Sequence, residues 1–143
     1  LTGKDHIRGA LKTYRKKCFE DIGGLKSAMG WDTIDELLAQ FYGWHFKTDD
    51  TLKVKHLKPT GKNYKRKVNY SQGQAFYQMR YGYVLTFIAS TKLALRKKSF
   101  NFFIDSLKGY ARAKKNNLEY LVTKEQGAFI RRLRWKNIRK KFL

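Results

Sequence analysis

The sequence contains a single cysteine and a single proline among its 143 residues. One cysteine cannot form an internal disulfide, so a secreted disulfide scaffold is excluded. No run of about 18 or more uncharged apolar residues is present, which excludes a polytopic membrane protein. Acidic residues are scarce, because 11 Asp and Glu stand against 32 Lys and Arg, for a net charge of +21. The first residues contain neither an initiator Met nor an apolar signal core, so we expect a chain truncated at its front.

The composition provides enough apolar surface for a folded chain. Hydrophobic residues make up 42% of the sequence and aromatic residues 15%, whereas disordered chains contain few aromatics. The length allows one domain or part of a larger one. We therefore expect a folded protein.

The positive charge is concentrated after Pro59. Residues 1–58 carry 11 basic and 8 acidic side chains, a net charge of +3, while residues 59–143 carry 21 basic and 3 acidic ones, a net charge of +18. Of the 22 aromatic residues, 15 also lie in the second part. A basic, aromatic-rich segment attracts polyanions, and both nucleic acid and an anionic membrane surface fit that description. The pattern predicts a boundary near residue 59.

Residues 1–58 predict a mixture of strands and helices. A helix over residues 15–22 is stopped by a pair of glycines. A second helix has Thr33 as its capping residue and Glu36 as the capping-box partner, and it ends at Gly43. Strands are expected over residues 7–14, 44–46 and 52–56.

Residues 59–143 predict helices. Apolar residues recur at helical spacing over three segments, which are residues 72–95, 100–115 and 118–143. Lys and Arg residues make these predicted helices basic and amphipathic. The predicted fold class is an α/β front piece followed by a mainly α-helical basic region.

Two carboxylates at the start of the second predicted helix offer a catalytic arrangement. Asp32 and Asp35 are three residues apart, so they share one helix face near the positive end of the helix dipole, which keeps them ionised. An ionised carboxylate at a rigid, partly enclosed helix start is what a general base needs to remove a proton from a sugar hydroxyl. The simpler interpretation is that Asp32 and Glu36 only stabilise the helix dipole.

The front piece resembles family 2 glycosyltransferases, the inverting nucleotide-sugar enzymes of the A-type fold. The resemblance covers about residues 7–58, where the order and spacing of several short segments agree with that family. These segments are Gly9-Ala10, Tyr14-Arg15-Lys16, Ile22-Gly23-Gly24-Leu25, Gly30-Trp31-Asp32-Thr33-Ile34-Asp35-Glu36, Gly43-Trp44 and Val54-Lys55-His56. The resemblance implies the acceptor-side end of a Rossmann-like catalytic domain that transfers a sugar from a nucleotide-sugar donor.

The resemblance also implies roles for individual residues. Asp32 aligns with the Asp of the family's acidic motif and would be the catalytic base, with Asp35 as the alternative. Trp31, which replaces the Glu that usually precedes this Asp, can stack on an acceptor ring. Glu36 is the other expected acceptor contact. His56 matches a family histidine that lies near the nucleotide diphosphate and its metal.

The nucleotide-binding half of the family and its metal-binding Asp-x-Asp motif are absent from this sequence. The resemblance therefore implies that a divalent metal, Mg or Mn, is held mainly by a missing N-terminal half. We expect the chain to be inactive on its own.

Residues 58–95 are similar to the C-terminal extension of a subgroup of bacterial family 2 enzymes, an extension that is expected to associate with the membrane. The similar segments are Lys58-Pro59-Thr60-Gly61, Gly73-Gln74-Ala75-Phe76-Tyr77 and Arg80-Tyr81-Gly82-Tyr83. We accordingly expect a cytoplasmic protein, peripheral at the inner face of the cell membrane, that acts on a lipid-linked or polysaccharide acceptor in cell-envelope polysaccharide synthesis. The residues expected at the anionic membrane surface are Arg96, Lys97, Lys98, Arg131, Arg132 and Arg134.

A small basic nucleic-acid-binding protein is the alternative, because clustered Lys and Arg are the usual electrostatic footprint of such proteins. The front piece argues against it. No helix-turn-helix, zinc-finger spacing or RNP-type motif is present in the sequence. The acidic residues at positions 32, 35 and 36 would repel phosphate.

Overall fold

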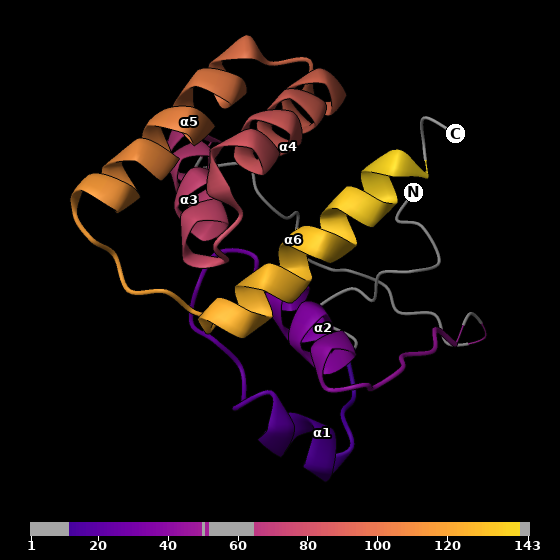
Figure 1. Cartoon of the computed structure of the whole chain (residues 1–143). Coiled ribbons are helices and arrows are strands. Elements are labelled where there is room, and N and C mark those ends of the chain that lie inside the picture. The colour runs from indigo at the N-terminus through magenta and orange to yellow at the C-terminus, as the bar shows by residue number, and fades with distance from the viewer. Residues whose placement is uncertain (1–11, 50, 52–64, 141–143) are drawn as a thin grey trace. The chain divides into compact units, whose positions relative to one another are not determined.

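The computed structural model describes residues 12–49, 51 and 65–140. These residues form six helices (Figure 1), which are α1 (Lys16–Asp21), α2 (Trp31–Phe41), α3 (Lys65–Gln78), α4 (Gly82–Lys97), α5 (Phe100–Lys115) and α6 (Lys124–Arg139). The chain divides into two compact units, Leu1–Asn63 with α1 and α2, and Tyr64–Leu143 with α3 to α6. None of the six helices is long and apolar enough to cross a membrane.

The predicted α/β front piece is wrong, because the described part of the first unit contains helices and no strand. The strand expected over residues 44–46 is not formed. The strand expected over residues 7–14 is described only from residue 12, and residues 12–14 form no strand. The third expected strand, residues 52–56, lies outside the described residues.

The end of α2 explains why no strand follows it. The backbone N–H of Trp44 donates to the carbonyl of Ala39 at 2.9 Å, and the N–H of Gly43 donates to Gln40 at 3.1 Å. These bonds satisfy carbonyls of the last helical turn. Gly43 has a φ of 79°, a left-handed conformation that glycine adopts without steric cost. The first donors after α2 therefore end the helix and are not free to pair with a strand.

The helix predicted over residues 15–22 is confirmed as α1. Cys18 and Ile22 are buried, and burial raises the pKa of the Cys18 thiol. The predicted glycine stop is also confirmed, because Gly23 and Gly24 have φ values of 70° and 71°. The N–H of Gly24 donates back to the carbonyl of Phe19 at 3.0 Å, which closes the helix end.

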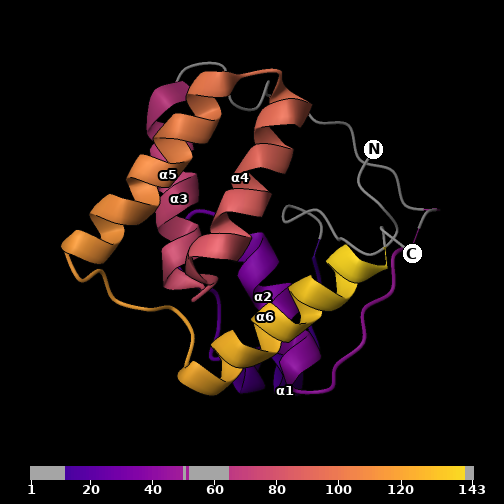
Figure 2. The ribbon, with the colours of Figure 1, turned by 45° about the horizontal axis from the view of Figure 1, so that its top comes forward.

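In the second unit, α3, α4 and α5 pack against one another (Figures 1 and 2). Asn69 of α3 donates to Asp105 of α5 at 3.2 Å, and further along both helices the rings of Tyr77 and Tyr110 lie 5.6 Å apart. The two helices therefore run parallel. Only residues 98–99 separate α4 from α5, and these two helices run antiparallel as a hairpin (Figure 2).

The single helix predicted over residues 72–95 is wrong, because the chain forms two helices that are separated at residues 79–81. Arg80 has a φ of 56°, the left-handed conformation that usually ends a helix at a glycine. The N–H of Tyr81 donates to the carbonyl of Phe76 at 3.1 Å, and the two rings stack 5.1 Å apart. Ring stacking and this hydrogen bond thus fix a helix end that has no glycine.

The backbones of α3 and α5 meet at two glycines. A methyl group at Gly73 would lie 1.8 Å from the carbonyl oxygen of Ser106, and one at Gly109 would lie 2.1 Å from that of Tyr70. Neither position has room for a side chain. Beside this contact, the buried hydroxyls of Ser90 and Ser106 share a hydrogen bond of 2.9 Å between α4 and α5.

The predicted helix over residues 100–115 is confirmed as α5, which Ser99 caps by accepting from the N–H of Phe102 at 3.3 Å. The helix predicted over residues 118–143 is shorter than expected. It begins only at α6, where Thr123 and Gln126 form a capping box.

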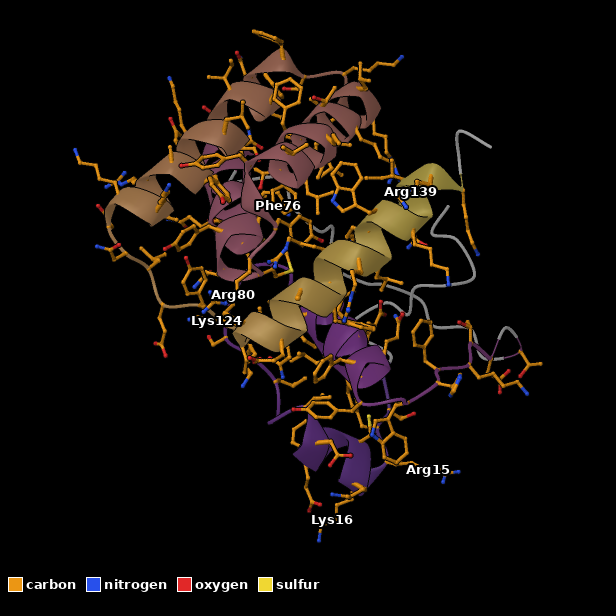
Figure 3. All side chains as sticks on the ribbon, viewed as in Figure 1. Arg15, Lys16, Phe76, Arg80, Lys124 and Arg139 are labelled. Carbon is orange, nitrogen blue, oxygen red and sulfur yellow. The ribbon has the colours of Figure 1, made fainter. Side chains whose placement is uncertain are left out.

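Arg80 attaches α6 to the other helices of the second unit. Its Nε donates to the carbonyl of Val122 at 2.9 Å, and its guanidinium lies 3.5 Å from the ring centroid of Tyr120. Its own carbonyl accepts from Nη1 of Arg131 at 2.8 Å. Figure 3 shows the Arg80 side chain beside the first turn of α6, where Lys124 is also labelled.

We expect Gly73→Ala and Gly109→Ala each to destabilise the second unit. The added methyl group overlaps backbone atoms of the facing helix, and such overpacking costs about 1–3 kcal/mol. Thermal unfolding followed by circular dichroism measures this loss. Lys108→Ala, an exposed change adjacent to Gly109, serves as the control. Unfolding of both glycine variants at the wild-type temperature would contradict the close approach of α3 and α5.

Candidate functional site

The predicted site surrounds the first turns of α2. Gly30 precedes this helix with a φ of 77°, and its carbonyl accepts from the N–H groups of Thr33 and Ile34 at 2.9 and 3.1 Å. The predicted capping box is therefore wrong, because Thr33 lies inside the helix and Gly30 precedes it. Asp32 is the one acidic residue of the first turn, where a negative charge interacts favourably with the helix dipole.

Lys12 contacts all four residues that the sequence analysis assigns to catalysis and acceptor binding. Its Nζ lies 2.9 Å from Oδ1 of Asp35 and 3.0 Å from Oε1 of Glu36. The same ammonium donates to the backbone carbonyl of Asp32 and lies 5.9 Å from the ring centroid of Trp31. One cation thus brings the predicted residues together.

Asp35 is held inside this cluster. Its side chain is 3% exposed and that of Lys12 is 4% exposed. The hydroxyl of Tyr14 donates to Oδ2 of Asp35, while the N–H of Glu36 donates to Oδ1 at 2.6 Å. Buried carboxylates are stable only when they are paired and hydrogen-bonded in this way. Asp35 therefore stabilises the start of α2, and both of its oxygens are already engaged.

Asp32 and Trp31 differ from Asp35 in exposure, because both residues are only half-buried. Lys12 binds Asp32 through the backbone, which fixes the position of the first turn. Of the two candidate bases, Asp32 is therefore the more exposed one.

Sequence reasoning missed Lys12 and Tyr14 as parts of this cluster. The two residues alternate with exposed neighbours, since Thr13 and Arg15 are exposed while Lys12 and Tyr14 are half-buried or more. Alternating burial is typical of an extended segment with one inward face, but the residue types at positions 12–15 do not alternate between apolar and polar, so the sequence does not show which side chains point inward. Figure 3 shows Arg15 pointing away from α1.

Asp21 links α1 to the residue that follows α2 within the first unit. Its Oδ1 accepts from Lys17 at 2.8 Å, and its Oδ2 accepts from the indole Nε1 of Trp44 at 3.0 Å. The hydrogen bonds from Lys17 and Trp44 lower the pKa of this carboxyl group. Trp44 thus contacts both helices of the first unit, because its indole binds the last residue of α1 and its backbone N–H binds the last turn of α2.

The described residues do not form a divalent-metal site. No group of three or more His, Cys, Asp or Glu among them is arranged to hold a metal ion. His56, the residue expected near the diphosphate and its metal, lies outside the described residues.

The basic residues predicted at a membrane surface have different surroundings. Arg96 and Lys98 are exposed at the end of α4, and Arg132 is exposed on α6. In contrast, Arg131 and Arg134 are half-buried and bind the corner between α3 and α4. Arg131 donates to the carbonyl of Arg80 at 2.8 Å, and Arg134 donates through Nε to the hydroxyl of Tyr81 at 2.9 Å.

Lys97 is the sixth of these residues. Its Nζ lies 4.0 Å from the ring centroid of Phe102, and partial desolvation there lowers the pKa of its ammonium group.

Comparisons with known proteins identify no relative. No protein-family model, curated protein or solved structure matches this chain. The resemblance to family 2 glycosyltransferases therefore depends on the quoted segments alone.

We expect Tyr14→Phe to change the pH dependence of stability in the first unit. Burial, and then the hydrogen bond to Asp35, raise the pKa of the Tyr14 hydroxyl. An unfolded tyrosine titrates near pH 10, so the contribution of Tyr14 is complete below about pH 10 and is lost as pH rises further. The free energy of unfolding should fall more steeply above that pH in the wild type than in Tyr14→Phe.

Urea unfolding followed by tryptophan fluorescence measures this difference, because Trp31 and Trp44 both lie in the first unit. The control is Tyr42→Phe, which removes the hydroxyl of a tyrosine that is 45% exposed. Identical pH profiles for Tyr14→Phe and the wild type would show that the bond to Asp35 does not hold in solution.

Proposed function

We propose that this chain is the acceptor-side part of a glycosyltransferase, with Asp32 as the general base. The observation that carries the proposal is the different treatment of two neighbouring carboxylates. The side chain of Asp35 is 3% exposed, in contact with Lys12 and Tyr14, whereas Asp32 is half-buried on the first turn of the same helix. A rigid support beside an accessible carboxylate suits acid–base catalysis, and the quoted sequence segments supply the reaction class.

In the proposed reaction, Asp32 removes the proton of an acceptor hydroxyl. The acceptor oxygen forms a bond to the anomeric carbon of the donor sugar while the bond from that carbon to the diphosphate oxygen breaks. The electron pair leaves with the nucleoside diphosphate, and in-line attack inverts the configuration. Asp35, Lys12 and Tyr14 are positioning residues in this scheme, because they hold the first turn of α2.

The acceptor in this proposal is a lipid-linked sugar or a polysaccharide, and the enzyme works at the inner face of the cell membrane. Exposed aromatic and basic side chains of the second unit support that location, because such side chains favour an anionic membrane surface. The donor is a nucleotide sugar, bound by residues outside those that the structure describes.

We expect Asp32→Asn to reduce sugar transfer by about 10²–10⁴-fold, the usual contribution of a general base. Turnover is measured in the full-length product of the gene with a radiolabelled nucleotide sugar and an acceptor extract. Glu20→Gln, which removes the same charge from an exposed position on α1, is the matched control. The folded state of each variant is checked by circular dichroism.

The variant Asp35→Asn distinguishes the catalytic role proposed for Asp32 from the structural role of Asp35. Removing this carboxylate leaves the buried Lys12 with weaker compensation, and breaking a buried pair costs about 3–5 kcal/mol. We therefore expect a loss of stability in Asp35→Asn and a loss of turnover without a loss of stability in Asp32→Asn. Turnover of Asp32→Asn within a few-fold of the wild type would rule out Asp32 as the base.

A further inference from the structure

Large apolar side chains of α4 and of the first residue of α5 are exposed in the second unit. We call this set of side chains the α4 stripe, and it consists of Tyr83, Val84, Phe87, Leu95 and Phe100. Their exposed fractions are 61%, 61%, 54%, 74% and 75%. Several exposed large apolar side chains on one helical hairpin favour binding to a protein or a membrane.

Besides Leu85 and Ala94, α4 buries polar side chains, while several of its larger apolar side chains stay exposed. The residues that α4 buries include two hydroxyl side chains, Thr86 and Ser90. Thr86 donates to the carbonyl of Gly82 at 2.7 Å, and Ser90 pairs with Ser106 of α5. A helix that only covered a core would bury its aromatic residues and expose its hydroxyls. The exposed aromatic side chains of α4 therefore need an apolar environment of their own.

Three aromatic residues of the stripe pack against rings of α5. The ring centroids of Phe87 and Phe103 lie 5.3 Å apart, and those of Phe100 and Phe103 lie 6.0 Å apart. At the other end of α4, Tyr83 lies 5.2 Å from Tyr110. These contacts join the stripe to the α4–α5 hairpin, so its apolar side chains are presented on a continuous support.

The α4–α5 hairpin that carries the stripe is strongly basic. Residues 82–115 contain eight basic side chains, which are Lys92, Arg96, Lys97, Lys98, Lys108, Arg112, Lys114 and Lys115. The only acidic residue in this range is Asp105, and it is buried. Lys114 reaches the edge of the stripe, where its Nζ donates to the hydroxyl of Tyr83 at 2.6 Å. A partner must therefore accept an apolar surface and be negatively charged around it.

An anionic lipid bilayer meets both requirements. Its headgroup layer accepts aromatic and aliphatic side chains to a depth of several ångströms while anionic lipids attract flanking Lys and Arg. A second copy of the chain would oppose two positive rims, and like charges across an interface are costly. RNA would satisfy the cations and its bases could stack on the exposed rings, but it would leave the aliphatic side chains of Val84 and Leu95 without an apolar environment.

We infer that the α4 stripe is the surface that enters the headgroup layer of an anionic bilayer, with α4 lying in the plane of the membrane. This inference deepens the membrane association included in the proposed function and rests on that association, but it does not depend on the role of Asp32. It keeps Arg96, Lys97 and Lys98 of the residues predicted from sequence, because all three lie at the end of α4. Arg131 and Arg134, two of the predicted membrane residues, bind within the second unit, and the hairpin of α4 and α5 takes over the contact.

Vesicle flotation with the full chain tests the inference. The vesicles contain either phosphatidylglycerol with phosphatidylcholine or phosphatidylcholine alone. Phe87→Ser/Leu95→Ser removes two side chains of the stripe, while Leu25→Ser/Met29→Ser removes two apolar side chains that are 50% and 38% exposed in the first unit. We expect the wild type and the Leu25/Met29 variant to bind the anionic vesicles, and the Phe87/Leu95 variant to bind at least about tenfold more weakly.

Each other outcome overturns part of the inference in a recognisable way. If the Phe87/Leu95 variant floats as the wild type does, the stripe is not the contact, although membrane association stands. If the wild type binds neither vesicle, the membrane association of the proposed function fails as well, while the turnover of Asp32→Asn still tests catalysis. A concentration-dependent dimer, or RNA retardation, that the Phe87/Leu95 substitutions abolish without vesicle binding would assign the stripe to a second copy or to nucleic acid.

Discussion

The contact between the backbones of α3 and α5 determines how the second unit is built. Gly73 and Gly109 let the two helices approach until no side chain fits between them. Close approach of this kind leaves only small groups at the adjoining contact, where Ser90 of α4 meets Ser106 of α5. On α4, Leu85 and Ala94 are buried together with Ser90, whereas Tyr83 and Phe87 contact rings of α5 and stay more than half exposed.

The first unit depends on a different constraint, the burial of charge. Lys12 compensates Asp35 and Glu36, and Tyr14 adds a hydrogen bond to Asp35. Charges that leave water are tolerated only with such partners. Lys12 therefore pairs with the side chains of Asp35 and Glu36, which stabilise the start of α2, whereas it contacts Asp32 through the backbone carbonyl. A single extended segment before α1 thus determines which carboxylate of α2 is buried most deeply.

Sequence patterns predicted the parts of the fold that local signals define. The helix that begins after Ser99 has a capping side chain and a regular apolar period, and its predicted bounds agree with α5. The break at Arg80 was missed because the apolar period continues through it and no glycine marks the left-handed residue. The α/β prediction failed where the N–H of Trp44 ends a helix. The ion pair of Lys12 with Asp35 joins residues 23 positions apart, and no local pattern specifies such a partner.

Arg80 connects three segments that are distant in the sequence. Its carbonyl accepts a hydrogen bond from Arg131 of α6. Its guanidinium contacts the loop residues Tyr120 and Val122, and its left-handed backbone conformation ends α3. Segments that share one residue in this way open together, because none can separate without breaking the bonds of the others. Amide hydrogens at the start of α6 and at the corner between α3 and α4 therefore belong to one cooperative unit of hydrogen exchange.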